Sequence, residues 1–146
     1  MSTSLPRVEP HVLRGDFTER SGHDAGKRLA ARGQRPDAVF AANDVMAIGC
    51  MVAFREEGLR VPDDVALAGF DDIPLAALVS PALTTVRVRI AELGRGALEQ
   101  LLLGIESPSR TRRVAKAFLP EVVVRGSCGA EKPKTRRRRR PGAGVS

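Results

Sequence analysis

Three short polar groups interrupt the apolar pattern of the sequence, and each follows a run of residues typical of a β-strand. Phe17, Asn43 and Asp71 stand in these groups, and each has an aspartate as a neighbour in the chain. In parallel α/β sheets, ligands collect at the carboxyl ends of the strands, where the loops carry polar groups. The sequence therefore predicts a polar cleft whose rim is lined by Phe17, Asn43 and Asp71.

Motifs of the common enzyme classes with layered α/β architecture are missing from the sequence. It contains no Gly-x-Ser-x-Gly nucleophile elbow, no phosphate-binding glycine loop ending in Lys-Ser/Thr, and no histidine pair at metal-ligand spacing. His11 and His23 lie apart from any cluster of acids and cysteines, so neither is expected to hold a metal or to act in catalysis. The sequence predicts a binding protein that is not an enzyme and uses no cofactor.

The cysteines and the apolar runs bear on the cellular compartment. Two cysteines, Cys50 and Cys128, are too few for a disulfide framework, which fits a reducing cytoplasm. We expect Cys50 to be a small buried apolar residue and Cys128 to be a free thiol. No run approaches the ~18 apolar residues that span a bilayer, and the start of the chain does not resemble a secretory signal. These features predict a cytoplasmic protein with no membrane partner.

The positive charge of the chain is concentrated at its C-terminal end. The 146 residues carry a formal net charge of +7, from 24 Lys+Arg against 17 Asp+Glu. Seven of the basic residues lie in 132–146, which holds no acid, so residues 1–131 are neutral overall. A block that includes Arg136–Arg140 repels itself and has nothing to bury, so the tail is predicted to be disordered. Two interpretations stay open: attraction to phosphate backbones without sequence preference, or a solvated extension with no selected role.

The remaining sequence alternates between strand-like and helix-like segments. Strands are expected at 8–13, 38–41, 65–70 and 84–88, with shorter extended pieces at 117–119 and 121–125. Helices are expected at 18–33, 44–57 and 90–103, with Thr18 and Asn43 or Asp44 as N-caps and Gly104 as the last stop. The strands at 38–41 and 65–70 are apolar throughout, as in strands buried on both faces of a parallel sheet. The pattern predicts an α/β fold with a mostly parallel sheet flanked by helices.

The helix expected from Asp44 carries no charge over residues 45–54. A surface helix normally shows a polar face, so this one must bury more than the stripe that faces the sheet. We interpret the additional apolar surface as a contact with another subunit. The alternative is a helix that is buried wholly within its own fold.

Five blocks of the sequence together resemble the LacI/GalR family of transcriptional regulators. The blocks are residues 15–22, 35–49, 58–65, 69–73 and 81–87, in order and at the spacing of the family. The resemblance covers residues 8–127 and implies part of a periplasmic-binding-protein-like type I core that senses an effector. It predicts a disordered start at 1–7, an incomplete effector-binding and dimerisation core at 8–127, and a disordered basic tail at 128–146.

The resemblance also implies roles for the three rim residues. Phe17 resembles the aromatic residue that packs against the effector ring, Asn43 a polar contact, and Asp71 the carboxylate that accepts effector hydrogen bonds. Val88 departs from the glutamine frequent in the family. Structural alternatives stay open: Phe17 as core, Asn43 as a cap that also contacts ligand, and Asp71 as a turn residue.

The helix from Asp44 and segment 73–81 resemble the homodimer surface of the family. On this basis we predict that Val45, Ile48, Val52 and Val79 lie at a dimer interface.

Taken as a whole, the resemblance implies the effector-sensing, dimerising portion of a LacI-type DNA-binding repressor, with a small metabolite, by family default a sugar, as effector. Operator DNA is expected to be contacted only through a helix-turn-helix that this chain lacks. Two alternatives remain: a solute-binding protein of a sugar transport system, which would need export, and a non-specific nucleic-acid binder acting through the Arg-rich tail.

Overall fold

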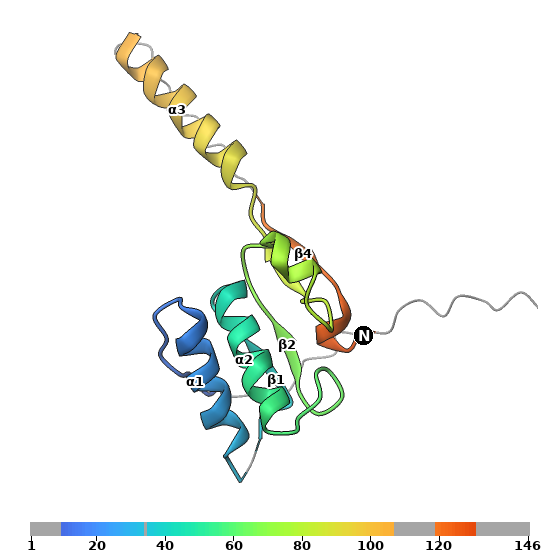
Figure 1. Ribbon diagram of the computed structural model, residues 1–146. Coiled ribbons are helices and arrows are strands. Elements are labelled where there is room, and N and C mark those ends of the chain that lie inside the picture. Colours follow the sequence, from blue (N-terminus) through green and yellow to red (C-terminus); the bar gives the residue numbers. More distant parts are fainter. Residues whose placement is uncertain (1–9, 34, 107–118, 131–146) are drawn as a thin grey trace, which may run out of the picture.

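The computed structural model describes residues 10–33, 35–106 and 119–130 of the chain (Figure 1). The α-helices are α1 (Glu19–Ala30), α2 (Asp44–Glu56) and α3 (Ile90–Glu106). The strands are β1 (Ala38–Phe40), β2 (Ala66–Ala68), β3 (Thr85–Arg87) and β4 (Glu121–Val123), with short 3-10 helices η1 (Pro74–Ala77) and η2 (Gly126–Cys128). The predicted order of helices and strands is confirmed from α1 through β4.

The strands form two pairs, which a bridge joins in the order β1-β2-β3-β4. β1 and β2 pair in parallel, with Val39 opposite Leu67, while β3 and β4 pair antiparallel, with Val86 opposite Val122. The bridge between the pairs is parallel and links Ala68 with Thr84, and the Gly69 N–H donates to the Thr84 carbonyl at 2.9 Å. The predicted α/β fold with a mostly parallel sheet is therefore confirmed.

Two capped helices pack closely against one another beside the sheet (Figure 1). Thr18 caps α1 by accepting from the Ser21 N–H at 3.1 Å, and Asn43 caps α2 by accepting from the Met46 N–H at 2.8 Å. A Cβ added at Gly49 would overlap the Glu19 carbonyl oxygen, so only glycine permits this approach of the helices.

The hydrophobic core lies between α2 and the strands. Phe54, Leu67 and Leu83 are almost completely buried at its centre. Because α2 is covered by the sheet on one side and by α1 on another, much of its apolar surface is buried within its own fold. Contacts within the fold thus account for much of the uncharged stretch of this helix. Only a smaller part of its surface is left for contact with another subunit.

Some expectations about the strands are wrong. Residues 10–13 of the strand expected at 8–13 pair with no described strand, although Leu13 packs against the core. Residues 8–9 lie outside the described part. β1 is not buried on both faces: Phe40 is 64% exposed, whereas Val39, which points to the opposite face, packs against the core.

The helices differ from expectation at their C-terminal ends. α1 ends at Ala30, before Gly33, and α3 continues past Gly104 to Glu106. α3 extends away from the body of the molecule, and none of its residues is buried (Figure 1). Among the described helices, none is both long enough and apolar enough to cross a bilayer. The expected disordered start at 1–7, the pieces at 117–118, and nearly all of the tail with Arg136–Arg140 lie outside the described residues.

Candidate functional site

Phe17 and Asn43 meet at one edge of the sheet. The Asn43 Nδ2 donates to the Phe17 carbonyl oxygen at 3.0 Å, while its Oδ1 caps α2. An amide offers two N–H donors and two lone pairs, so each of these atoms can take one more hydrogen bond. Phe17 has a φ of 66° and is 65% exposed. The interpretation of Phe17 as a core residue is therefore wrong.

Asp16 fixes the turn that presents Phe17. Its Oδ1 accepts from the Thr18 hydroxyl at 2.6 Å and from the Thr18 N–H at 3.0 Å. Hydrogen bonds from the Thr18 and Ser21 side chains and from the Thr18 backbone lower the pKa of Asp16 to about 2. The carboxylate is thus held in its ionised form near the start of α1, where its negative charge interacts favourably with the positive end of the helix dipole.

Asp71 lies at the same edge of the sheet as Asn43. The Asp44 N–H donates to the Phe70 carbonyl at 2.8 Å, which joins the start of α2 to the end of the neighbouring strand segment. The Asp71 N–H in turn donates to the Val86 carbonyl at 2.9 Å. Burial raises the pKa of Asp71, and the negative charge of Asp44 raises it further. The structure therefore brings together Phe17, Asn43 and Asp71 at one edge.

Asp44 is fully buried directly beneath this edge. It accepts from the Thr85 hydroxyl at 2.5 Å and from the Ile73 N–H at 2.9 Å, so it joins α2 to β3 and to the loop that follows Asp71. Gly69 leaves room for it, because a Cβ there would overlap the Asp44 carboxylate. The sequence suggested only a helix cap for Asp44, and its second role depends on contacts that are distant in the chain.

Sequence reasoning missed an ionic cluster on the other side of Asp71. Asp72 accepts from Arg87 Nε at 2.6 Å and from Arg125 Nη2 at 2.6 Å. The adjacent acids after an apolar strand hinted at Asp72, but no local pattern pointed to Arg125, which lies far along the chain.

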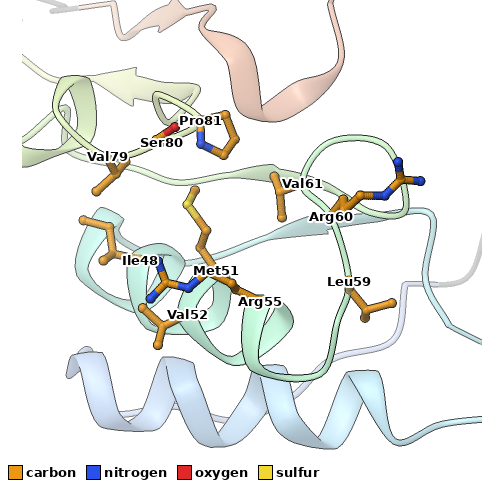
Figure 2. Close-up of a pocket in the computed structure, with 10 residues that line it drawn as sticks. All are labelled: Ile48, Met51, Val52, Arg55, Leu59, Arg60, Val61, Val79, Ser80 and Pro81. Atoms are coloured by element: carbon orange, nitrogen blue, oxygen red, sulfur yellow. The ribbon is translucent and has the colours of Figure 1, made fainter.

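Three of the four residues predicted for a dimer interface gather elsewhere on the molecule. Ile48, Val52 and Val79 line a hollow of about 430 Å³ between α2 and the 79–81 segment (Figure 2). Met51 reaches from α2 toward that segment, and Arg55 of α2 is also part of the lining. Val45 is partly exposed on α2 but does not line the hollow. The hollow is lined mostly by apolar residues and does not include Phe17, Asn43 or Asp71.

The described residues contain no group of three or more side chains suited to a metal ion. Cys50 is buried, and burial raises the pKa of its thiol to about 12. Cys128 is half-buried and unpaired with Cys50. The chemistry that the described site offers is hydrogen bonding and stacking.

Comparison with known proteins places this arrangement in a family. Residues 3–128 match the periplasmic binding protein-like domain, and the chain belongs to that family. The sequence is 38% identical over 116 residues to the HTH-type transcriptional repressor PurR of Photobacterium profundum, covering 80% of this chain and 34% of that protein. The predicted LacI/GalR-type effector-binding core is thereby confirmed.

Two solved structures support the same assignment. A transcriptional regulator CelR–cellobiose complex has a TM-score of 0.70 and 35% identity, covering 77% of this chain and 34% of that one. A LacI family transcriptional regulator from Lactobacillus casei with bound sucrose has a TM-score of 0.67 and 32% identity, covering 76% and 41%. The chain spans about a third of the length of the curated relatives that it matches.

Proposed function

We propose that this chain is the effector-sensing part of a LacI-type transcriptional repressor, which binds a small metabolite without converting it. The observation that carries the proposal is the convergence of Phe17, Asn43 and Asp71 from three separate loops on one sheet edge. The Asn43–Phe17 hydrogen bond and the Asp44–Phe70 hydrogen bond support it directly. Ligands of parallel α/β sheets bind at this position.

The three side chains complement one another chemically. The exposed ring of Phe17 covers an apolar face of a flat or cyclic ligand. The Asn43 amide donates and accepts, and the Asp71 carboxylate accepts charge-assisted hydrogen bonds from hydroxyl groups. A ligand ring with one apolar face and hydroxyl groups around its edge would complement these three side chains.

A sugar is the effector class that we propose. Two of the similar structures contain cellobiose and sucrose, and both are of regulators. Because glycoside hydrolysis uses a pair of carboxyl groups and only Asp71 among the three rim residues carries one, we propose binding and release of an unchanged sugar. Recovery of intact cellobiose after prolonged incubation with the chain, checked by proton NMR, tests that part; a hydrolysed product contradicts it.

Effector binding in a repressor acts by favouring one of two conformations. The curated relatives are named HTH-type repressors, and contact with operator DNA through such a motif is part of the proposal. Because a repressor acts on DNA, we place the protein in the cytoplasm.

We also propose that the protein is a homodimer through α2 and the 73–81 segment. The hollow lined by Ile48, Val52 and Val79 is apolar and open to the surface, and Leu78 beside it is strongly exposed. Apolar pockets of this kind take up side chains of a partner at the centre of an interface.

Isothermal titration with cellobiose and with sucrose tests the effector site. The Asp71→Asn variant should bind at least about tenfold more weakly, because hydrogen bonds to a charged acceptor contribute about 1.5–3 kcal/mol. Asp63→Asn removes an exposed carboxylate that pairs with Arg60 and is not part of the proposed site, and it serves as the matched control. Equal affinity of wild type and Asp71→Asn for a sugar that binds would refute the assignment.

A further inference from the structure

Two consecutive residues of the candidate site have a backbone conformation that L-amino acids rarely adopt. Asp71 has a φ of 110° and Asp72 a φ of 56°. Such conformations persist where the surrounding structure holds them, and they concentrate at ligand-binding sites. The contacts around these two residues therefore bear on how Asp71 is presented.

Asp72 is held by two arginines from different parts of the chain. Arg87 belongs to β3, and Arg125 follows β4; their donors reach the two carboxylate oxygens of Asp72 at 2.6 Å each. The Asp72 side chain is 8% exposed. Burial alone would raise the pKa of Asp72, but the hydrogen bonds from Arg125 and Arg87 outweigh it and lower the pKa. The Asp72 carboxylate is thus a charged acceptor, and each of its oxygens accepts a hydrogen bond from one arginine.

Arg125 is itself fixed in place. Its side chain is 17% exposed, and its Nη1 donates to the Leu83 carbonyl at 2.8 Å. Its backbone N–H donates to the Thr84 hydroxyl at 2.8 Å. The guanidinium therefore connects Asp72 to the backbone at Leu83, just before β3, which gives it a defined position from which to hold the loop.

The loop is anchored on both sides of Asp72. The Asp71 N–H donates to the Val86 carbonyl, and the Ile73 N–H donates to the buried Asp44. Between them, the Asp72 N–H donates to the Thr85 hydroxyl at a longer 3.4 Å, and the Asp72 carboxylate makes the two short contacts with the arginines. With residue 72 fixed, the peptide that joins it to Asp71 keeps one orientation.

We propose that Arg125 is a positioning residue for effector binding: by holding Asp72, it keeps Asp71 in the strained conformation that presents its carboxyl group at the ligand edge. This rests on the effector site proposed above. Arg125 does not touch the effector in this scheme, and its effect passes through Asp72.

We call the contact by which Arg125 holds Asp72 the clamp. Amide hydrogen exchange of the full ¹⁵N-labelled chain tests the clamp without any ligand. Arg125→Met should speed exchange of the Asp71, Asp72 and Ile73 amides at least about tenfold, because the loop loses a charge-assisted hydrogen bond. Exchange within α1 should stay unchanged. Arg60→Met is the matched control, since the Arg60 guanidinium also donates to both carboxylate oxygens of an aspartate, Asp64, elsewhere on the surface.

Affinity for cellobiose, measured on the same samples, connects the clamp to function. Arg125→Met should weaken binding at least about tenfold, Arg125→Lys should recover part of the loss, and Arg60→Met should match wild type. Wild-type exchange and affinity in Arg125→Met would overturn the proposal, and so would equal acceleration at every amide. If Arg125→Met does not fold, Arg125→Lys decides: faster exchange confined to residues 71–73 supports the clamp, and wild-type exchange there overturns it.

The two proposals fail in different ways. Absence of binding of either sugar by the wild-type chain would count against the effector assignment. The amide measurement would still show whether Arg125 holds the loop.

Discussion

Replacing Asp44 by alanine should destabilise the protein strongly, although no ligand contact is assigned to this residue. Asp44 is fully buried and accepts two hydrogen bonds, from the Thr85 hydroxyl and the Ile73 N–H. Hydrogen bonds to a charged group contribute about 1.5–3 kcal/mol each, so loss of both costs about 3–6 kcal/mol. This is a large share of the roughly 5–15 kcal/mol that holds a typical domain folded.

Urea unfolding followed by circular dichroism measures the effect. Asp44→Asn keeps one carbonyl acceptor and should lose about half as much, so the two variants form an ordered series. Asp63→Ala removes an exposed carboxylate and should change the free energy of unfolding by less than about 0.5 kcal/mol. A loss of less than about 1 kcal/mol in Asp44→Ala would refute the reasoning that this carboxylate joins α2 to the loop after Asp71.

Three further outcomes follow from the packing and the charges. Gly49→Ala should lower the free energy of unfolding by about 1–3 kcal/mol, since the new methyl group meets the α1 backbone; Gly33→Ala, with open space around it, should not show this loss in the same urea assay. Val79→Glu should shift a sedimentation profile from dimer to monomer by placing a charge in the apolar hollow, whereas an unchanged profile would argue against that interface. Hydrogen bonds from Lys27 and His23 lower the pKa of Glu56 in the folded protein. These contacts therefore stabilise the fold above the ordinary glutamate pKa, and the stabilisation is lost as pH falls through the lowered pKa. A Glu56→Gln variant should show a smaller fall in melting temperature over that pH range than the wild type, and an identical fall would contradict this reasoning.

The features that sequence reasoning predicted well are those set by local chemistry. Thr18 and Asn43 are good N-cap residues, and both cap the helices that follow them. The apolar runs at 38–41 and 65–70 contain β1 and β2, which pair in parallel. The gathering of polar loops at one edge followed from the geometry of parallel sheets and needed no knowledge of long-range contacts.

The features that sequence reasoning missed depend on residues far apart in the chain. The exposure of Phe40 shows that the described core covers only the face of β1 that carries Val39, which the apolar run by itself does not reveal. The burial of much of α2 depends on α1 approaching it at Gly49. The contact of Arg125 with Asp72 joins residues that share no periodic pattern, so no sequence window contains the signal.

A titration of the ¹⁵N-labelled chain with cellobiose, followed by amide chemical shifts, tests the central claim most directly. If the sheet edge binds the effector, the largest shifts should cluster at Phe17, Asn43 and Asp71 and saturate with one common dissociation constant. Saturable shifts confined to the hollow around Ile48 and Val79, with none at those three residues, would contradict it.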